Sequence, residues 1–566
     1  MNFREEYPRM QFKRDKWINL NGEWQFDFDF GSSAEEKGFY KNGVELSKKI
    51  NLPFCPESQL SGIGYTDRID AVCYKKEIDV SFDSTKENVV LHFGAVDYRC
   101  SVYVNETKVG THKGGYVSFD FDITSALSEG KNTITVFAYD DSRNSLIPSG
   151  KQSDKFYSYG CFYTRTTGIW QTVWLEFVPK NHIDSVKFYP NIADCSIGIS
   201  ASLCGTDNLE IEVEYEGKKV GCKKTENCSG EVYLSVELSE KHLWEIGNGR
   251  LYDVKFKFGE DLVESYFGLR EVRIEGNKFL LNNKSVFQRL VLDQGFYPDG
   301  IYTAPSDAEL LGDIKRSLAC GFNGARLHEK IFEERFLYYC DKMGYIVWGE
   351  YPDWGLDFSL KESVYPVLDE WTCEVKRDFN HPAIIGWCPH NETWDTDGRK
   401  QFDEGIALVY KVTKQLDPTR PCIDTSGNFH VLTDIFDIHD YNQDPPSFKA
   451  FYDKVKTPDY VDRYEVRQHY DGKKPFFISE YGGIGWTEDK SGWGYGNVPE
   501  SKQDFINRFK GLASAILDNP NIMGLCYTQL TDVEQEQNGL YTYDRKPKFD
   551  TEIFKEILSR KAAIED

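Results

Sequence analysis

Hydrophobic and polar residues alternate with a period of two along most of the first part of the chain. The alternation is clearest in residues 24–28, 89–93 and 173–177, where every second side chain is apolar and can face one side of a sheet. Turn signals such as Asn21-Gly22 and Gly114-Gly115 separate these short runs. We therefore predict an antiparallel jelly-roll β-sandwich over residues 1–180.

A second β-rich module follows over residues 181–271. Its clearest runs are residues 209–215 and 252–258, which again alternate between apolar and charged positions. The length of the module suits an immunoglobulin-like β-sandwich.

After about residue 271 the pattern changes to apolar strand, loop and amphipathic helix, repeated to the end of the chain. The first helix of this region begins near Ser306 and Glu309, which form a capping-box pattern, and ends at Gly321; the next ends at Gly344. No G-x-G-x-x-G follows any strand, so a doubly wound nucleotide-binding sheet is disfavoured. We predict a (β/α)8 TIM barrel over residues 272–566. Its eight expected strands are residues 285–292, 322–327, 345–350, 384–392, 422–427, 435–441, 475–482 and 522–530.

Composition narrows the possible partners. The 566 residues carry a formal net charge of −24, which disfavours nucleic acid or an anionic membrane as a partner. The amino terminus lacks the apolar core of a signal peptide and no run of about 18 apolar residues occurs, so we expect a cytosolic protein. The fourteen cysteines are scattered singly, which favours reduced thiols over disulfides or a metal site.

Two apolar runs end abruptly in a glutamate. Residues 385–392 end at Glu392, and residues 475–482 carry Glu480. Buried barrel strands deliver such side chains to the rim where the active sites of TIM barrels lie. Two carboxylates about 5 to 5.5 Å apart are the minimum equipment for cleaving a glycosidic bond with retention of configuration. A single glutamate at a strand end is, however, more often a solvated or salt-bridged rim residue.

Other polar residues at strand ends are weaker candidates. Tyr441 could donate a hydrogen bond to Glu480, and Asn391 could hold a substrate hydroxyl. Arg326 and His328 could orient the nucleophile and a sugar hydroxyl, although a structural ion pair and a capped loop histidine are at least as plausible. Each of these four residues closes a strand or follows one directly.

Two further groups of residues are candidates for a metal site and for sugar platforms. His390 and His439 raise the possibility of a metal-dependent hydrolase, which the absence of H-x-H or H-E-x-x-H spacing disfavours. Aromatic residues make up 15% of the chain, and tryptophans can serve as sugar platforms. Trp354 and Trp394 are the candidates, whereas core packing is favoured for the tryptophans inside strands, Trp348 and Trp387.

The motifs together resemble glycoside hydrolase family 2, the β-galactosidase and β-glucuronidase family, over nearly the whole chain. Residues 17–24 (WINLNGEW) and 167–175 (TGIWQTVWL) resemble the opening and the closing strand of that family's jelly roll. Residues 267–270 (FGLR) and 279–284 (FLLNNK) resemble the passage into its barrel, and residues 323–328 (NGARLH) its second barrel strand. The resemblance implies that Asn391-Glu392 carry the acid/base and that Glu480 is the nucleophile.

Two departures from the family pattern bear on the substrate. The histidine-rich segment after the first barrel strand is replaced by residues 291–300 (VLDQGFYPDG), and His390 stands where a glycine is common. The Asn-x-Lys element that neutralises the uronate in β-glucuronidases is also absent, because residues 536–544 read EQNGLYTYD. Asp293, Gln294 and Glu350 could instead bind the hydroxyls of a neutral sugar, although each might equally be a loop cap or a rim ion pair.

We therefore expect a retaining exo-glycosidase acting on terminal neutral sugars, most specifically β-D-galactosides. The alternatives are an α-L-arabinopyranosidase or β-glucuronidase of the same family and, in another class, a non-catalytic carbohydrate-binding scaffold. The expected partner is a carbohydrate substrate, with a homo-oligomer possible. Double displacement needs no cofactor, and the sequence identifies no metal site.

Overall fold

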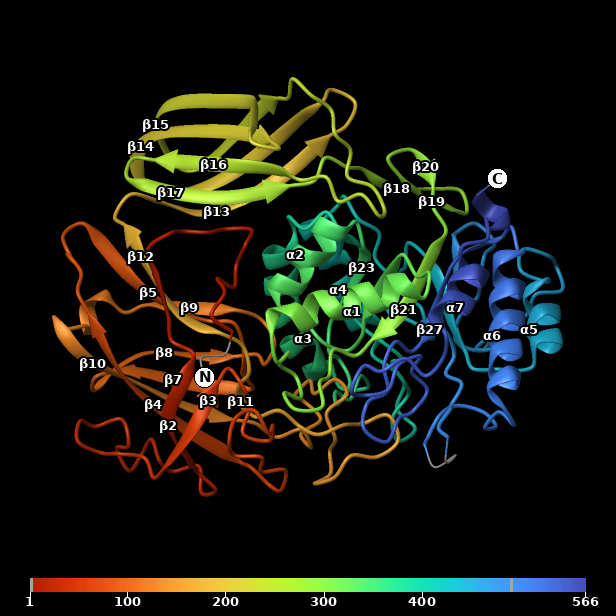
Figure 1. Ribbon diagram of the computed structural model, residues 1–566, viewed down its shortest axis with the longest axis horizontal. Helices are drawn as coiled ribbons and strands as arrows, with labels where there is room; N and C mark the ends of the chain where they lie inside the picture. Colours follow the sequence, from red (N-terminus) through yellow and green to blue (C-terminus); the bar gives the residue numbers. More distant parts are fainter. Residues whose placement is uncertain (1–3, 489–491, 566) are drawn as a thin grey trace.

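A computed structural model describes residues 4–488 and 492–565 and divides them into three parts (Figure 1). The first part, in red and orange, and the second, in yellow, are built from strands. The third, from green to blue, alternates strands with helices. Each part encloses a hydrophobic core of its own. None of the helices in the described residues is both long and apolar enough to cross a membrane.

The first part is a sandwich of two antiparallel sheets. A four-stranded sheet has the order β1-β12-β5-β9, and a six-stranded sheet has the order β3-β2-β4-β10-β7-β8. The alternating apolar residues of both sheets, such as Leu91, Leu175, Val102 and Val136, are buried in one core. The elements are β1 (Trp17–Asn19), β2 (Gly22–Phe28), β3 (Lys48–Leu52), β4 (Ala71–Val80), β5 (Glu87–Phe93), β6 (Val96–Asp97), β7 (Arg99–Val104), β8 (Thr107–Lys113), β9 (Phe119–Asp122), η1 (Thr124–Ala126), β10 (Gly130–Tyr139), β11 (Gly168–Ile169) and β12 (Val173–Pro179).

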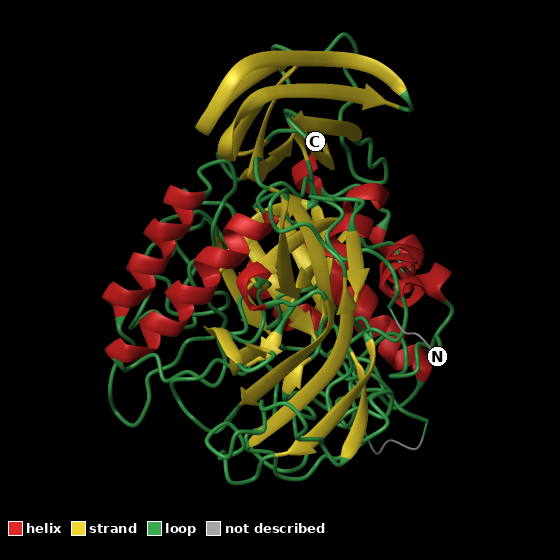
Figure 2. Ribbon diagram, turned by 90° about the vertical axis from the view of Figure 1, so that its left-hand side faces the viewer, coloured by secondary structure: helices red, strands yellow, loops and turns green. Residues whose placement is uncertain are grey.

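The second part is immunoglobulin-like and contains two unusually long strands, whose curvature is visible at the top of Figure 2. β14 pairs with β13 over residues 196–204 and with β16 over residues 209–214, so a single strand serves both layers. Irregular register between Leu203 and Leu209 accommodates the bend. The elements are β13 (His182–Asn191), β14 (Ser196–Tyr215), β15 (Lys218–Glu237), β16 (Tyr252–Phe258) and β17 (Asp261–Phe267).

The third part is a parallel barrel wrapped by helices, entered through a small antiparallel sheet of β18 (Val272–Glu275), β19 (Lys278–Leu281) and β20 (Lys284–Ser285). Within the described residues its sheet has the order β24-β23-β22-β21-β27-β26-β25. The strands are β21 (Gln288–Asp293), β22 (Gly324–Leu327), β23 (Ile346–Glu350), β24 (Ile384–Cys388), β25 (Phe436–Asp440), β26 (Phe476–Gly482) and β27 (Ile522–Thr528). The helices are α1 (Asp307–Ala319), α2 (Glu334–Met343), η2 (Lys361–Ser363), α3 (Val364–Asp378), α4 (Asp403–Leu416), α5 (Pro445–Tyr452), α6 (Lys502–Leu517), α7 (Thr551–Leu558) and η3 (Ala563–Glu565).

The fifth expected strand, residues 422–427, is not a regular strand. It meets the β24 segment only through isolated parallel bridges, Trp387 to Cys422 and Asn391 to Ser426. Backbone hydrogen bonds still join the two segments, among them Ile423 N to Trp387 O at 2.9 Å and Ser426 N to His390 O at 2.8 Å. The side chain of Asp424 accepts hydrogen bonds from the backbone of Val431 and Leu432. The segment still occupies the gap in the barrel wall next to β24.

Helix α1 corrects one detail of the expected capping. Ser306 is the N-cap, but its side chain makes no capping hydrogen bond; Glu309 N instead bonds the carbonyl of Ser306. The expected ends hold, because Gly321 and Gly344 take positive φ after α1 and α2. The fourteen cysteines are all free thiols.

Candidate active site

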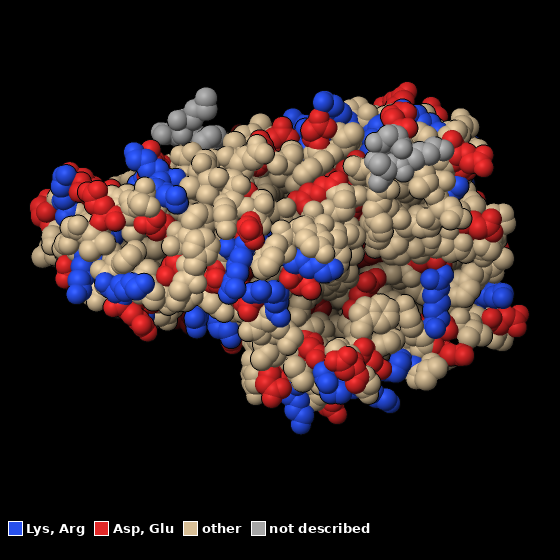
Figure 3. Space-filling view, turned by 90° about the horizontal axis from the view of Figure 1, so that it is seen from below, with Lys and Arg blue, Asp and Glu red and all other residues tan. Residues whose placement is uncertain are grey.

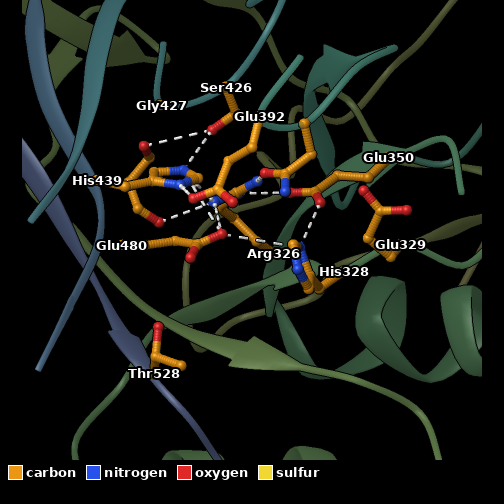
Figure 4. A network of polar contacts seen from close by, with 12 residues as sticks. Arg326, His328, Glu329, Glu350, Glu392, Ser426, Gly427, His439, Glu480 and Thr528 are labelled. Carbon is orange, nitrogen blue, oxygen red and sulfur yellow. Dashed lines mark hydrogen bonds and ion pairs between the residues drawn. The ribbon is translucent and has the colours of Figure 1, made fainter. Parts of the chain in front are cut away.

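The two glutamates predicted from the strand ends lie at the same end of the barrel. Glu392 follows β24, and Glu480 lies near the end of β26. Because the carboxyl ends of parallel strands open onto one face of a barrel, both side chains reach the same region. Figure 4 shows them pointing toward one imidazole, that of His439 on β25.

His439 bridges the two carboxylates. Glu392 Oε1 lies 2.6 Å from His439 Nδ1, and Glu480 Oε1 lies 3.5 Å from His439 Nε2. One oxygen of each glutamate falls within 4.8 Å of the other. This distance is close to the separation of about 5 Å that allows one carboxylate to attack a sugar while the other protonates the leaving oxygen.

Both oxygens of Glu480 accept hydrogen bonds. Oε1 accepts from Arg326 NH1 at 3.0 Å, and Oε2 accepts from the hydroxyl of Tyr441. Tyr441 is itself held in place by Tyr495, whose ring stacks on it at 3.7 Å. Glu480 is buried, so these contacts fix its orientation.

Arg326 connects Glu480 to the second and third barrel strands. Its Nε donates to Glu350, and its NH2 donates to Asn391 Oδ1 at 3.1 Å. Burial alone would lower the pKa of Arg326, but the charges of Glu350 and Glu480 outweigh it and raise that pKa well above the ordinary value. Asn391 Nδ2 is buried and makes no hydrogen bond within the described chain, so it can donate to a bound hydroxyl.

His328 is held as a neutral acceptor. Burial, followed by the positive charges of Lys151 and Arg326, lowers its pKa well below the ordinary value. Its Nδ1 lies 3.1 Å from Glu350 Oε2, so the neutral ring donates from Nδ1 and leaves Nε2 as an acceptor. The two carboxylate oxygens of Glu350 are therefore bonded to Arg326 and His328. Glu350 forms a rim ion pair rather than binding a sugar hydroxyl.

Glu392 and His439 shift each other's pKa. Burial would raise the pKa of Glu392, but the hydrogen bond and charge of His439 outweigh it and lower that pKa. In return, burial would lower the pKa of His439, but the charges of Glu480 and Glu392 raise it. Gly427 packs on the imidazole so closely that a Cβ would lie 2.5 Å from the ring, which explains the glycine at this position.

The backbone at Glu392 is held in an uncommon conformation. Its φ is +50°, in the left-handed region that non-glycine residues seldom adopt. Three bonds hold this turn: Asn391 N donates to Asp353 Oδ1 at 3.0 Å, Glu392 N donates to Ser426 O at 2.9 Å, and Trp354 Nε1 donates to Asn391 O at 3.0 Å. The conformation fixes the direction in which the carboxylate leaves the strand.

Asp293 does not join this cluster. Its side chain accepts from Gly295 N at 2.9 Å, as a loop cap does, and burial raises its pKa to about 6. Gln294 bonds Gln529 at 2.9 Å. Trp348 and Trp387 are buried in the core, as their place inside strands predicts, whereas Trp394 is 45% exposed at the rim.

A loop of the jelly roll, residues 149–165, reaches this site, and sequence reasoning did not place it there. Ser149 N and Gly150 N donate to Trp354 O at 2.8 and 3.1 Å. A Cβ on Gly150 would lie 2.4 Å from the carbonyl oxygen of Glu329, so only glycine allows this approach. The loop brings Lys151 to the site, with Nζ 3.5 Å above the ring of Trp354.

Lys151 is charged and has no direct anionic partner. It is 4% exposed, and no hydrogen bond or ion pair to its Nζ is found among the described residues. Burial would lower its pKa, but the charges of Cys161, Glu536 and Glu329 raise it. The sequence carried no signal for Lys151, because its position depends on the docking of two domains. The sequence indicates His439 only as a possible metal ligand.

Glu392, His439 and Glu480 are also the cluster that could hold a metal ion. The donor atoms fit a hydrogen-bonded bridge better. The 2.6 Å between Glu392 and His439 is shorter than the spacing of about 3 Å that neighbouring ligands of one ion keep. The two ring nitrogens also face different carboxylates.

Figure 3 shows the molecule from below the view of Figure 1; this face is hollowed near its centre, and acidic atoms appear in the hollow.

Comparison with known proteins agrees with this architecture. Family models match residues 18–179 (glycosyl hydrolases family 2, sugar binding domain), 181–270 (glycosyl hydrolases family 2) and 272–562 (glycosyl hydrolases family 2, TIM barrel domain). The chain belongs to glycosyl hydrolase family 2. It is an O-glycosyl hydrolase with a jelly roll, an immunoglobulin-like sandwich and a TIM barrel, rather than a non-catalytic scaffold.

Relatives in this family are named as β-glucuronidases or as β-galactosidases. A β-glucuronidase of Streptococcus agalactiae is 24% identical over 553 residues, which cover 87% of this chain and 88% of the relative. A β-galactosidase of Thermoanaerobacterium thermosulfurigenes is 27% identical over 462 residues, covering 76% of this chain and 61% of the relative.

Solved structures agree on the fold. A β-glucuronidase from an uncultured Clostridium superposes with a TM-score of 0.81 at 19% identity, covering 98% of this chain and 99% of that one. A Ruminococcus gnavus β-glucuronidase in complex with D-glucuronic acid gives 0.79 at 18% identity, covering 98% and 100%. At such identity these likenesses establish the fold alone.

Proposed function

We propose that the protein is a retaining exo-β-glycosidase that works by double displacement. The observation that carries the proposal is the placement of Glu392 and Glu480 on either side of His439, with carboxylate oxygens within 4.8 Å of each other. Glu480 is the better nucleophile, because Arg326 and Tyr441 each bond one of its oxygens and fix its orientation.

In the first step, Glu480 forms a bond to the anomeric carbon while the glycosidic bond breaks. The electron pair of that bond leaves with the aglycone oxygen, which takes the proton held by the Glu392–His439 pair. In the second step, Glu392 takes a proton from water, and the resulting hydroxide displaces Glu480 from the sugar. Asn391 Nδ2 is free to bond a sugar hydroxyl beside the reacting carbon.

For the sugar, we propose a neutral glycone, most specifically β-D-galactose, with α-L-arabinopyranose as the close alternative. Several buried carboxylates, Glu329, Asp353 and Glu536, surround the site in addition to the two reacting glutamates. Burial raises the pKa of all three, that of Glu329 to about 8, which favours neutral carboxyl groups. Such groups can hydrogen-bond sugar hydroxyls but supply no positive charge to pair with a uronate.

A β-glucuronide is the second candidate, favoured by Lys151. The residues of the Asn-x-Lys slot lack a lysine, but Lys151 reaches the site from the jelly roll and its ammonium is unpaired within the described chain. Lys151 can bond a uronate carboxylate or a sugar hydroxyl. Its mutation should therefore distinguish a glucuronide from a galactoside as the substrate.

The test is hydrolysis of a panel of nitrophenyl glycosides, comprising β-galactoside, α-L-arabinopyranoside, β-glucuronide and β-mannoside, by wild type, Glu480→Gly and Glu392→Gly. Glu480→Gly should lose turnover by about 10⁴-fold or more. With azide it should yield the α-glycosyl azide, because azide enters where the nucleophile stood, whereas Glu392→Gly should yield the β-azide. Full activity in either variant, or the same azide anomer from both, would overturn the assignment of roles.

The same panel separates the glycones. If the substrate is a glucuronide, Lys151→Met should lower kcat/KM for that substrate by about 10²-fold more than for the galactoside, because a charged hydrogen bond contributes roughly 1.5–3 kcal/mol. If both wild type and Lys151→Met prefer the galactoside, the hypothesis that the substrate is a glucuronide is excluded.

A further inference from the structure

A pocket opens beside Glu392. It has a volume of about 300 Å³ and is bounded by the jelly-roll loop, the segment after β23 and the segment after β24. Its walls include the aromatic rings of Phe162, Trp354 and Trp394. Glu392 lines the pocket, but Glu480, Arg326 and Asn391 do not.

This position identifies what the pocket would hold. The group that protonates a glycosidic oxygen stands next to the leaving group, and the nucleophile stands on the opposite face of the sugar. A pocket that contains Glu392 without Glu480 is therefore on the leaving-group side. The inference rests on the proposed function, because it takes Glu392 as the acid.

The lining is mostly apolar, which suits an aromatic leaving group better than a second sugar. Besides the three rings it includes Leu356 and Phe358, and Thr396 carries the one polar side chain other than Glu392 among the described residues that line it. A second sugar would bring several hydroxyl groups, each of which costs free energy when it is buried without a partner. A planar aromatic group would lose no such bonds and could stack on the rings.

The aromatic walls are fixed before any ligand binds. Trp394 packs edge-on against Phe429 and Tyr464, with centroid distances of 5.6 and 6.0 Å. Trp354 is held by the bond from its indole NH to Asn391 O and by Lys151 above its ring, and Phe162 lies 5.3 Å from it. Such a slot needs little reorganisation to accept a flat ring.

We propose that this pocket is an aglycone subsite for planar aromatic groups, so that the substrates are β-glycosides of phenol-type or other aryl alcohols rather than oligosaccharides. The volume is at the lower end of the range for small-molecule sites and fits one or two fused rings.

The test uses the glycosyl-enzyme, which removes differences in leaving-group chemistry. The full-length protein is trapped with the 2-deoxy-2-fluoro glycosyl fluoride of the best sugar in the panel, and reactivation is timed with 2-naphthylmethanol or with glucose at equal concentration. The aryl alcohol should reactivate the enzyme about tenfold faster than glucose, a difference equivalent to one to two aromatic contacts. Trp394→Ala should remove most of this advantage, measured as the ratio of the rate with aryl alcohol to the rate with water alone for the same variant.

Tyr365→Ala is the matched control, because Tyr365 is an aromatic residue of α3 that is 67% exposed and does not line the pocket. It should behave as wild type. Glucose reactivating as fast as the aryl alcohol, or equal effects of the Trp394 and Tyr365 substitutions, would overturn the aryl subsite and indicate a sugar-binding platform. Failure of the fluoro sugar to label Glu480 at all would instead refute the proposed function on which the subsite depends.

Discussion

At the residue scale, the site combines groups that strand ends reveal with groups that they do not. Glu392, Glu480 and Tyr441 could be predicted, because each ends or closely follows an apolar run that becomes a buried strand. Asp293 has the same kind of position, yet it caps its own loop. Sequence position gives the end of the barrel at which a side chain lies, but not the rotamer or the partner that it chooses.

His439 should set the pH range over which the acid is protonated. Its pKa is raised by Glu480 and Glu392 against the effect of burial, so the Glu392–His439 pair keeps its proton above the ordinary histidine range. In His439→Gln the proton must be held by a carboxyl group alone, whose ordinary pKa is about 4.3. We expect the basic limb of the kcat/KM profile to move to lower pH by at least about one unit.

The control for this profile is Ser426→Ala, which removes a hydroxyl 3.0 Å from His439 Nε2 but keeps the imidazole. It should leave the basic limb in place. If His439 serves only to hold the fold, His439→Gln will lower activity at every pH and the limb will not move.

At the scale of elements, residues 422–427 do not form a regular strand. Residues 422–427 (CIDTSG) begin with two apolar residues that resemble a strand, but Asp424 and Ser426 direct their side chains to neighbouring loops and to Asp437. Periodicity therefore predicted the wall of the barrel at this point, but it could not predict that the backbone bonds to the β24 segment are too widely spaced to form a regular strand.

His430 should stabilise this irregular wall. Its Nδ1 lies 2.8 Å from Asp424 Oδ1 and its Nε2 lies 3.1 Å from Asp437 Oδ1. Burial would lower its pKa, but the hydrogen bond and charge of Asp424, followed by those of Asp437, raise it to about 10. Because the folded pKa exceeds the unfolded value of about 6.5, this stabilisation is complete below pH 6.5 and is lost as pH rises through about 10.

His430→Gln should accordingly lower the free energy of unfolding by about 3–5 kcal/mol near pH 6, as expected for breaking a buried ion pair. Denaturant unfolding from pH 6 to 10 should show the difference between wild type and variant shrinking as pH rises. His242→Gln, which changes a half-buried histidine beside Glu240, is the control and should have little effect. A difference that stays constant with pH would mean that His430 is not charged in the folded protein.

At the scale of the whole molecule, the active site belongs to two domains. The three modules and their order were predictable, because each has its own periodicity and its own core. The reach of the jelly-roll loop into the barrel was not, since neither Lys151 nor Phe162 carries any local signal of the domain that it contacts. The loop is anchored on residues after β27: the side chain of Gln535 donates to the carbonyls of Gly160 and Phe162 at 2.8 and 3.0 Å.

Gln535 should therefore tune the active site without touching the substrate. Gln535→Ala removes two bonds that hold the loop, each contributing about 1 kcal/mol, so kcat/KM for aryl glycosides should fall by about threefold to tenfold, mainly through KM. The unfolding midpoint should change little, because the loop is only one contact between the domains. Gln503→Ala, an exposed glutamine on α6, is the control. If Gln535→Ala leaves KM unchanged while Trp394→Ala raises it, the loop contributes nothing to the aglycone subsite and Trp354 and Trp394 form it alone.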